Sequence, residues 1–346
     1  MTRLSIIALY FVIVLPCSGE ESVGDVYAST IEASEYYNLK QYNNAITKAT
    51  KVIEGDKYNA EALLIRAHSY AEMGDYGHAI SDYEVVAKIR TSDPRAFFFL
   101  GVIWGELGNS RKAINYYTLA IQHDKKYVDA IVNRGWMYLN DSSTYDKARN
   151  DFEYAADIEL NNPHVLSGMA ELYVMDNEIL QALNYYDKAI NTKENDYNLH
   201  YLRAGAYMIA GKFDRAIGDL DKAISVNPMY WDAYIRRGNC YAEIGDKLMA
   251  VNDYSSVINS DATNITAYNN RAYTYYELGE YADAVRDYSM GIKLKPDMQR
   301  LAEMHYERSK AYMNLNKYEN ALDDAKMALK TEPDNLKYED WYEGLQ

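Results

Sequence analysis

The sequence predicts an all-α protein, a solenoid of antiparallel helix pairs. Alanines recur along the 346-residue chain about every 34 residues, and a small residue stands twelve or thirteen positions before each of them. An aromatic residue follows that small residue by three positions. Small residues at this spacing let two helices approach closely, so each repeat is expected to contain a helix A, a short turn and a helix B. The alanines are Ala45, Ala79, Ala113, Ala148, Ala182, Ala216, Ala250, Ala284 and Ala321.

Setting each alanine at position 20 of a 34-residue unit gives nine repeats, from Val26 to Asn335. Only Ala, Gly or Ser occurs at position 8, and every repeat has Tyr or Trp at position 11. Positions 11, 17 and 24 together hold half of the 36 tyrosines, so much of the tyrosine excess is expected to be architectural. The small residues at position 8 are Ala33, Ala67, Gly101, Gly135, Ala170, Ala204, Gly238, Ala272 and Ser309.

The turns agree with this register. Glycine stands at position 15 in five repeats, where a left-handed residue would end helix A. Asp93 before Pro94 and Asn162 before Pro163 each predict an N-cap followed by a first-turn proline. Two departures are visible, an extra residue in the turn of repeat 4 and the insertion 299–301 before repeat 9.

Residues 1–19 read as a secretory signal peptide with cleavage after Gly19. The apolar run from Leu4 to Leu15 has twelve residues, too few for the roughly 20 that span a bilayer. A membrane anchor and a lipoprotein acylated at Cys17 are the alternatives, although Pro16 fits a lipid-signal site badly. We expect an exported protein, whether secreted, periplasmic or in the lumen of the secretory pathway, without a stable membrane anchor.

The composition argues against several classes of protein. A hydrophobic fraction of 48% and a charged fraction of 25% are typical of an ordered, soluble chain. The net charge of −15 disfavours nucleic-acid binding and adsorption to anionic lipid. If Cys17 leaves with the leader, Cys240 is the one remaining thiol, so no internal disulfide is expected.

The recurring residues resemble the tetratricopeptide repeat family. The family pattern has a small residue at position 8, Tyr at 11, Gly at 15, Ala at 20, an aromatic residue at 24 and a small residue at 27. Residues 265–298 match this pattern almost throughout. The resemblance implies a right-handed superhelix, with the A helices on the concave face and residues 26–335 forming one solenoid. Such arrays need a terminal cap, and residues 336–346 are the candidate capping helix.

Positions 7 and 23 vary together, which predicts an ion pair between helices A and B. Repeat 1 reverses the charges with Glu32 and Lys48, whereas repeats 3 and 5 carry neither charge. Removing one member of a desolvated pair would strand a charge at about 3–5 kcal/mol, which explains why both change together. The predicted pairs are Arg66 with Asp82, Arg134 with Asp151, Arg203 with Asp219, Arg237 with Asp253, Arg271 with Asp287, and Arg308 with Asp324.

No catalytic, cofactor or metal motif is present, so we expect a protein that is not an enzyme and carries no cofactor or metal. The six histidines fall in different repeats or on different helix faces, without metal-ligand spacing. Two sequons, at Asn140 and Asn264, lie in predicted turns and would matter for a protein of a eukaryotic secretory pathway.

The concave face is the remaining candidate site. Positions 2, 5, 9, 12 and sometimes 13 of helix A should face it, and Phe97, Phe98 and Phe99 of repeat 3 cannot share one helix face. Either a partner or the packing of the solenoid must cover these rings. The expected groove residues are Leu64, Phe98, Val102, Val132, Trp136, Leu139, Val174, Tyr201, Met208, Tyr273 and Tyr276, with Met175 and Ile209 beside them.

These features predict a scaffold for protein–protein interaction that binds a protein or peptide segment in an apolar groove. The acidic rim of that groove suits a partner with hydrophobic anchors and some basic residues. A holdase-type co-chaperone and a self-assembling structural subunit are the alternatives, so a homo-oligomer also stays open.

Overall fold

A computed structural model describes residues 21–346, so the predicted signal peptide lies outside the described residues. Within this range the chain forms α-helices joined by short turns and contains no β-strand. Two compact units, residues 1–172 and 173–346, are described separately below as the N-terminal and C-terminal units. The boundary falls inside the first helix of repeat 5.

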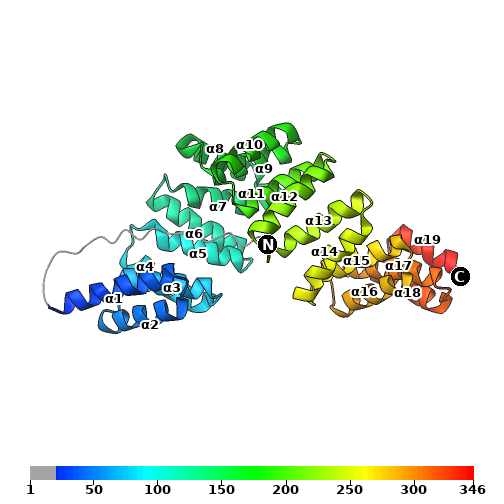
Figure 1. The fold of residues 1–346 in the computed structure, drawn as a ribbon, viewed down its shortest axis with the longest axis horizontal. Coiled ribbons are helices and arrows are strands. Elements are labelled where there is room, and N and C mark those ends of the chain that lie inside the picture. Colours follow the sequence, from blue (N-terminus) through cyan, green and yellow to red (C-terminus); the bar gives the residue numbers. More distant parts are fainter. Residues whose placement is uncertain (1–20) are drawn as a thin grey trace. The chain divides into compact units, whose positions relative to one another are not determined.

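The N-terminal unit contains repeats 1–4, and successive helices run back and forth against their sequence neighbours (Figure 1). The extra residue of repeat 4 is accommodated by a single 3-10 turn, η1 (Ser142–Thr144), which leaves the following helix in register. The helices are α1 (Glu21–Asn38), α2 (Tyr42–Gly55), α3 (Ala60–Glu72), α4 (Tyr76–Ile89), α5 (Pro94–Glu106), α6 (Ser110–His123), α7 (Val128–Leu139), α8 (Tyr145–Glu159) and α9 (Pro163–Met175), which crosses the boundary.

The C-terminal unit contains helix B of repeat 5 and repeats 6–9. The insertion before repeat 9 lengthens α17, and Asp297 caps its first turn by accepting from the backbone N–H of Arg300. The helices are α10 (Ile179–Thr192), α11 (Tyr197–Ile209), α12 (Phe213–Val226), α13 (Trp231–Glu243), α14 (Lys247–Ser260), α15 (Ile265–Leu278), α16 (Tyr281–Lys293), α17 (Met298–Asn314), α18 (Tyr318–Thr331) and α19 (Leu336–Leu345).

Small residues bring helices A and B together in every repeat. The alanines at position 20 are fully buried, as are the alanines and the serine at position 8. Where position 8 is Gly101, an added Cβ would lie 2.6 Å from the ring of Tyr117. The large aromatic residue at position 24 therefore fills the space that the small residue leaves, which confirms the predicted helix pairing.

Left-handed residues end helix A as predicted. Gly74, Gly108, Gly211, Gly245 and Gly279 have φ between 66° and 90°. Repeats 1, 5 and 9 lack this glycine, and Lys40, Asn177 and Asn316 adopt the same conformation at φ near 60°. Asp93 and Asn162 accept backbone hydrogen bonds at the starts of α5 and α9, so both predicted caps are present.

The final helix, α19, packs against α18. Tyr338 is buried against Tyr306, and the indole N–H of Trp341 donates to Ser309 Oγ at 2.8 Å. These contacts cover the A helix of repeat 9.

Candidate functional site

The six arginine–aspartate pairs form between helices A and B. In each, Nε and Nη2 of the arginine donate to the two carboxylate oxygens of the aspartate at 2.5–2.9 Å. The aspartate side chains are almost fully buried. The reversed pair, Lys48 with Glu32, is much more exposed. This geometry is that of a two-point charge-assisted contact that holds one helix pair in register.

A third contact of each arginine was not anticipated from the sequence. Its Nη1 donates at 2.6–3.2 Å to position 25 of the preceding repeat, so the guanidinium joins three helices. Glu84 and Glu153 occupy position 25 before repeats 3 and 5, which have Leu100 and Met169 in place of the arginine. The sequence signal for this contact is a short oxygen-bearing side chain at position 25 of the repeat that precedes each arginine. They are Thr50, Thr118, Asp187, Asp221, Ser255 and Ser289.

Two histidines, also missed from the sequence, extend this network in the C-terminal unit. His200 Nδ1 lies 3.2 Å from Asp219 Oδ1, and His305 Nδ1 lies 2.8 Å from Asp324 Oδ1. Desolvation works to raise the pKa of both aspartates, but the arginine and histidine contacts outweigh it and lower the pKa overall. Asp253, which has no such histidine, has a raised pKa because desolvation dominates.

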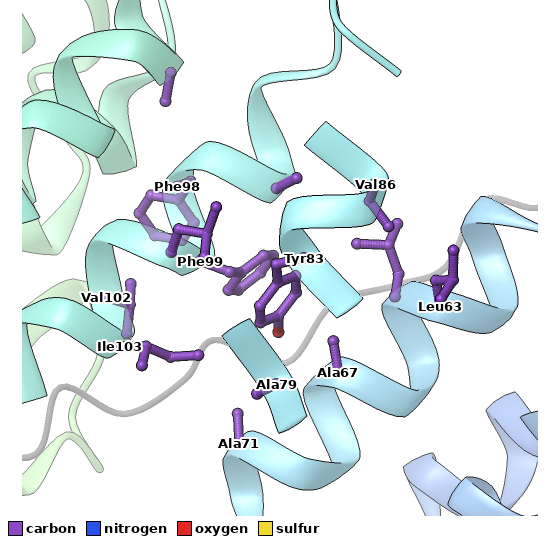
Figure 2. Packing of buried hydrophobic residues seen from close by; sticks show 14 of the residues in the cluster. Leu63, Ala67, Ala71, Ala79, Tyr83, Val86, Phe98, Phe99, Val102 and Ile103 are labelled. Atoms are coloured by element: carbon purple, nitrogen blue, oxygen red, sulfur yellow. The ribbon is translucent and has the colours of Figure 1, made fainter. Parts of the chain in front are cut away.

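Four predicted groove residues belong to the core, which corrects the sequence interpretation. Leu64, Phe98, Val102 and Val132 are all buried. Phe98 packs edge-on against Phe99 and lies within 6 Å of the ring centres of Tyr117 and Tyr127. Figure 2 shows Phe98, Phe99 and Tyr83 gathered in this core.

The physical reason for the correction is the run of phenylalanines. Phe98 and Phe99 both point into the packed layer, and Phe97 stacks on His123 with ring centres 5.0 Å apart. An apolar helix face that reaches the layer of neighbouring helices is buried by the array itself and does not need a partner. Of the two explanations left open for these rings, the structure supports packing.

The other predicted groove residues of repeats 4 to 8 keep part of their surface. Trp136 and Leu139 are half-buried, and Trp136 packs edge-on against Phe152. Val174, Tyr201, Met208 and Tyr276 are also half-buried, whereas Tyr273 is 48% exposed. The accessible members therefore lie mainly in the C-terminal unit.

Polar and aromatic groups replace apolar ones on the helix-A face of the C-terminal unit. The guanidinium of Arg236 lies 3.8 Å from the ring centre of Tyr201 and donates to its backbone oxygen at 3.0 Å. One turn further along, Asn239 Oδ1 accepts from Tyr254 and from Asn270 at 2.7 and 2.9 Å. This surface can offer amide groups and aromatic faces to a ligand.

The end of this face combines tyrosines with acidic side chains. Lys310 Nζ lies 5.1 and 5.3 Å from the ring centres of Tyr276 and Tyr306 and pairs with Glu307 at 2.8 Å. Desolvation raises the pKa of Tyr273, and Glu277 and Glu307 raise it further. The rise caused by these carboxylates indicates a negative field beside an exposed aromatic ring.

Potential metal ligands do not cluster in the part of the chain that the structure describes. Residues 21–346 contain no group of three or more His, Cys, Asp or Glu placed to hold a metal ion. Over the same range no helix is long and apolar enough to cross a membrane.

His68 lies in the core, where its Nδ1 contacts the Tyr83 hydroxyl. Burial lowers the pKa of His68 to about 3, and Arg95 adds to the effect.

The two sequon asparagines differ in their surroundings. Asn140 is exposed after α7, whereas Asn264 is half-buried and its Oδ1 accepts from Ala267 at the start of α15. Cys240 is buried, which raises the pKa of its thiol to about 11.

The fold and these contacts define a protein built from repeated helix pairs. Family models described as tetratricopeptide repeat match residues 60–93, 201–257, 265–298 and 302–335. Three of these four ranges begin at position 1 of a repeat as the alanines define it. The chain belongs to the tetratricopeptide repeat family, which confirms the predicted fold class.

Known proteins are similar to this chain in sequence or in fold. Human mitochondrial import receptor subunit TOM70 is 23% identical over 164 residues, 47% of this chain; the chain spans only 22% of that protein. The structure of pilF from Pseudomonas aeruginosa is similar at TM-score 0.54 and 15% identity, covering 64% of this chain and 98% of that one. A tetratricopeptide repeat protein from Parabacteroides merdae has TM-score 0.50 and 18% identity, covering 73% and 98%.

Repeats of this kind stack into extended surfaces, which supports a role as a scaffold for protein–protein interaction.

Proposed function

We propose that the chain is an exported scaffold that holds a protein or peptide segment against the helix-A face of repeats 6–9. The carrying observation is that Tyr273 stays exposed at position 9 of repeat 8, and that Met208 and Tyr276, predicted for the same face, are half-buried. Position 9 of repeat 3, Val102, is buried in the core. The similarity to an import receptor subunit favours a polypeptide ligand.

The chemistry of this face supports a partner with apolar anchors and basic side chains. Tyrosine rings accept apolar groups and, on their faces, cations. Glu243, Glu277 and Glu303 are exposed on the same A helices, and the whole chain carries a net charge of −15. An acidic surface of this kind attracts basic segments and repels acidic ones.

Affinity capture from the native source tests the proposal with matched variants. The face variant is Met208→Ser with Tyr273→Ser, and the control is Met298→Ser with Tyr318→Ser, a methionine and a tyrosine that are exposed elsewhere. We expect a short list of partners, identified by mass spectrometry, that the face variant loses and the control keeps. A long list of unfolded clients would point to a holdase, and capture of the chain alone to a structural subunit.

In residues 1–19 a charged residue is followed by an apolar run and then by small residues, and this order supports the export part of the proposal. N-terminal sequencing of the protein from its source should find Glu20 as the first residue. A mature chain that begins at Met1 would contradict export through this leader.

A further inference from the structure

One arginine between repeats 6 and 7 is held in a fixed position on the helix-A side. The guanidinium of Arg236 on α13 lies 3.8 Å from the ring centre of Tyr201 on α11, and its Nη1 donates to the backbone oxygen of Tyr201 at 3.0 Å. These two contacts fix the plane of the guanidinium. No other repeat has an arginine or lysine at position 6, so the repeat architecture does not require a base there.

A missing side chain makes room for this guanidinium. Gly205 stands at position 9 of repeat 6, where every other repeat has a side chain. A Cβ added to Gly205 would lie 2.8 Å from Nη1 of Arg236. Both residues are half-buried, so the guanidinium keeps some surface at the point where the series of position-9 side chains is interrupted.

The charge of Arg236 is not matched by a carboxylate. The six arginines at position 7 pair with aspartates, whereas Arg236 has no carboxylate oxygen within 4.0 Å in the part of the chain that the structure describes. Asp232 stands one helical turn before it, at the spacing of a helical ion pair, yet the guanidinium turns to Tyr201 instead. Nε and Nη2 make no hydrogen bond to residues 21–346. Their two parallel N–H groups are left for a ligand.

A buried hydroxyl without a partner belongs to the same cluster. The ring of Tyr230 meets the ring of Tyr201 edge-on, with ring centres 4.9 Å apart. Tyr230 is 8% exposed, and its hydroxyl has no hydrogen-bond partner among the described residues. Burial and Asp232 raise the pKa of this hydroxyl and Arg236 lowers it, so the hydroxyl lies in the field of the guanidinium. A buried donor without an acceptor is costly, which points to an acceptor that a ligand supplies.

The chemistry of these donors fits a carboxylate. Parallel N–H groups of a guanidinium match the two oxygens of a carboxylate, and the Tyr230 hydroxyl is a further donor for the same group. The negative charge of Asp232 opposes a dianion such as phosphate more strongly than a singly charged carboxylate. Lys310, at position 9 of repeat 9, is already paired with Glu307 and offers no second site of this kind.

We propose that Arg236, beside Gly205, binds the side-chain carboxylate of an aspartate or glutamate in the segment held on the helix-A face. This inference rests on the proposed function, and it adds one acidic position to a partner that is otherwise apolar and basic. The carboxylate sets the register of the bound segment along repeats 6 and 7. A planar, two-point contact of this kind discriminates a carboxylate from a carboxamide of the same shape.

The first experiment probes the arginine with acetate and therefore needs no partner. Nitrogen-15 NMR of the full chain, with the Nε signal of Arg236 assigned from Arg236→Lys, should show a shift that saturates at millimolar acetate and is absent with chloride. Arg215 is the matched control, because it also lies near a tyrosine ring, that of Tyr207, and has no carboxylate partner, but it is exposed. A linear response at Arg236, equal to that of Arg215, would overturn the proposal.

The second experiment uses a pair of peptides. A binder is selected from a library of short apolar and basic sequences that each contain one glutamate, and is compared with its glutamine twin. Fluorescence anisotropy should show about tenfold tighter binding of the glutamate peptide. The ratio should fall to about one in Arg236→Gln and stay unchanged in Arg215→Gln. Tyr230→Phe should lower the ratio without lowering the melting temperature, because its hydroxyl has no partner to lose.

Failure of this inference differs from failure of the proposed function. Peptides that lose affinity in the Met208→Ser and Tyr273→Ser variant but bind equally as glutamate and glutamine forms would overturn the carboxylate site alone. Peptide binding that ignores those two residues would overturn the proposed function, and the acetate titration would still decide whether Arg236 takes a carboxylate.

Two further outcomes would replace the proposed ligand. Affinity that depends on a free C-terminus, and not on the glutamate, would put a chain terminus in the site. Saturation of the Arg236 signal by phosphate at a lower concentration than acetate would make a phosphate group the ligand. Either result overturns the assignment to an acidic side chain.

Discussion

The N-terminal and C-terminal units build the same helix pairs but fill helix A differently. In repeats 2 and 3, positions 5 and 9 hold Leu64, His68, Phe98 and Val102, all buried. In repeats 7 and 8 the same positions hold Ile235, Asn239, Asn269 and Tyr273, which keep exposed surface. The difference shows that the same repeat can bury these helix-A side chains in its own core or leave them accessible to a partner.

The units also differ in how much they rely on buried charge. The N-terminal unit contains two of the arginine–aspartate pairs, and its repeat 3 uses Leu100 and Tyr116 instead. The C-terminal unit contains four pairs, two of them extended by a histidine. The C-terminal unit, whose helix-A side chains are more exposed, therefore contains more of the buried arginine–aspartate pairs.

The largest effect is expected from truncating helix A in the N-terminal unit. Phe98→Ala should lower the free energy of unfolding by about 3–5 kcal/mol, because it empties a site among three aromatic rings. Tyr273→Ala should cost under about 1 kcal/mol, because its ring is half exposed. Urea denaturation measures both. Equal losses would mean that the two units do not differ in this way.

The ion pairs can be exchanged for the apolar solution of repeat 3. Arg271→Ala should destabilise by about 3 kcal/mol, because Asp287 stays buried without its partner. Arg271→Leu with Asp287→Tyr, copied from Leu100 and Tyr116, should recover most of that loss in thermal unfolding. Breaking the exposed pair with Lys48→Ala should have a clearly smaller effect. If the double variant is no more stable than Arg271→Ala, the buried-pair interpretation is wrong.

The left-handed turns allow a gain in stability. Lys40 has φ of 58°, a conformation that disfavours a side chain, so Lys40→Gly should stabilise by about 1 kcal/mol. Asn316→Gly in the C-terminal unit should gain less, because asparagine tolerates this conformation better. Melting temperatures of the two variants test the ranking, which a larger gain at Asn316 would reverse.

The smallest expected effect concerns acid stability in the C-terminal unit. A lowered pKa at Asp324 stabilises the fold above the unfolded-state value of about 3.9, and this stability is lost as the pH falls through the folded-state pKa. His305→Tyr, copied from Tyr268 in repeat 8, removes one of the groups that lower the pKa of Asp324. The midpoint of acid unfolding should rise by roughly a few tenths of a pH unit. His123→Tyr, at an exposed site, should leave it unchanged.

Helix pairs, turns and caps followed from the sequence because they depend on local spacing. The alanines at position 20 predicted the helix pairs, and the glycines at position 15 predicted where helix A ends. The paired changes at positions 7 and 23 indicated contacts between helices, because a stranded charge is costly in any repeat. Each of these signals recurs along the chain, so one repeat could be checked against the others.

Accessibility could not be predicted in the same way. The position-5 side chains Phe98 and Tyr201 belong to the same face by register, yet only the packing of neighbouring helices decides which one remains exposed. Phe98 meets Phe99, Tyr117 and Tyr127, whereas Tyr201 meets the flat guanidinium of Arg236. Burial depends on what adjacent helices supply, and register within one helix does not contain that information.

The sequence by itself determined the repeat, its register, the helix boundaries and the charged pairs, since these rest on short-range spacing and on charges that must be matched. The tertiary structure alone decided which helix-A side chains form the core and which groups join three helices. These properties arise between repeats, where side chains distant in sequence compete for the same space.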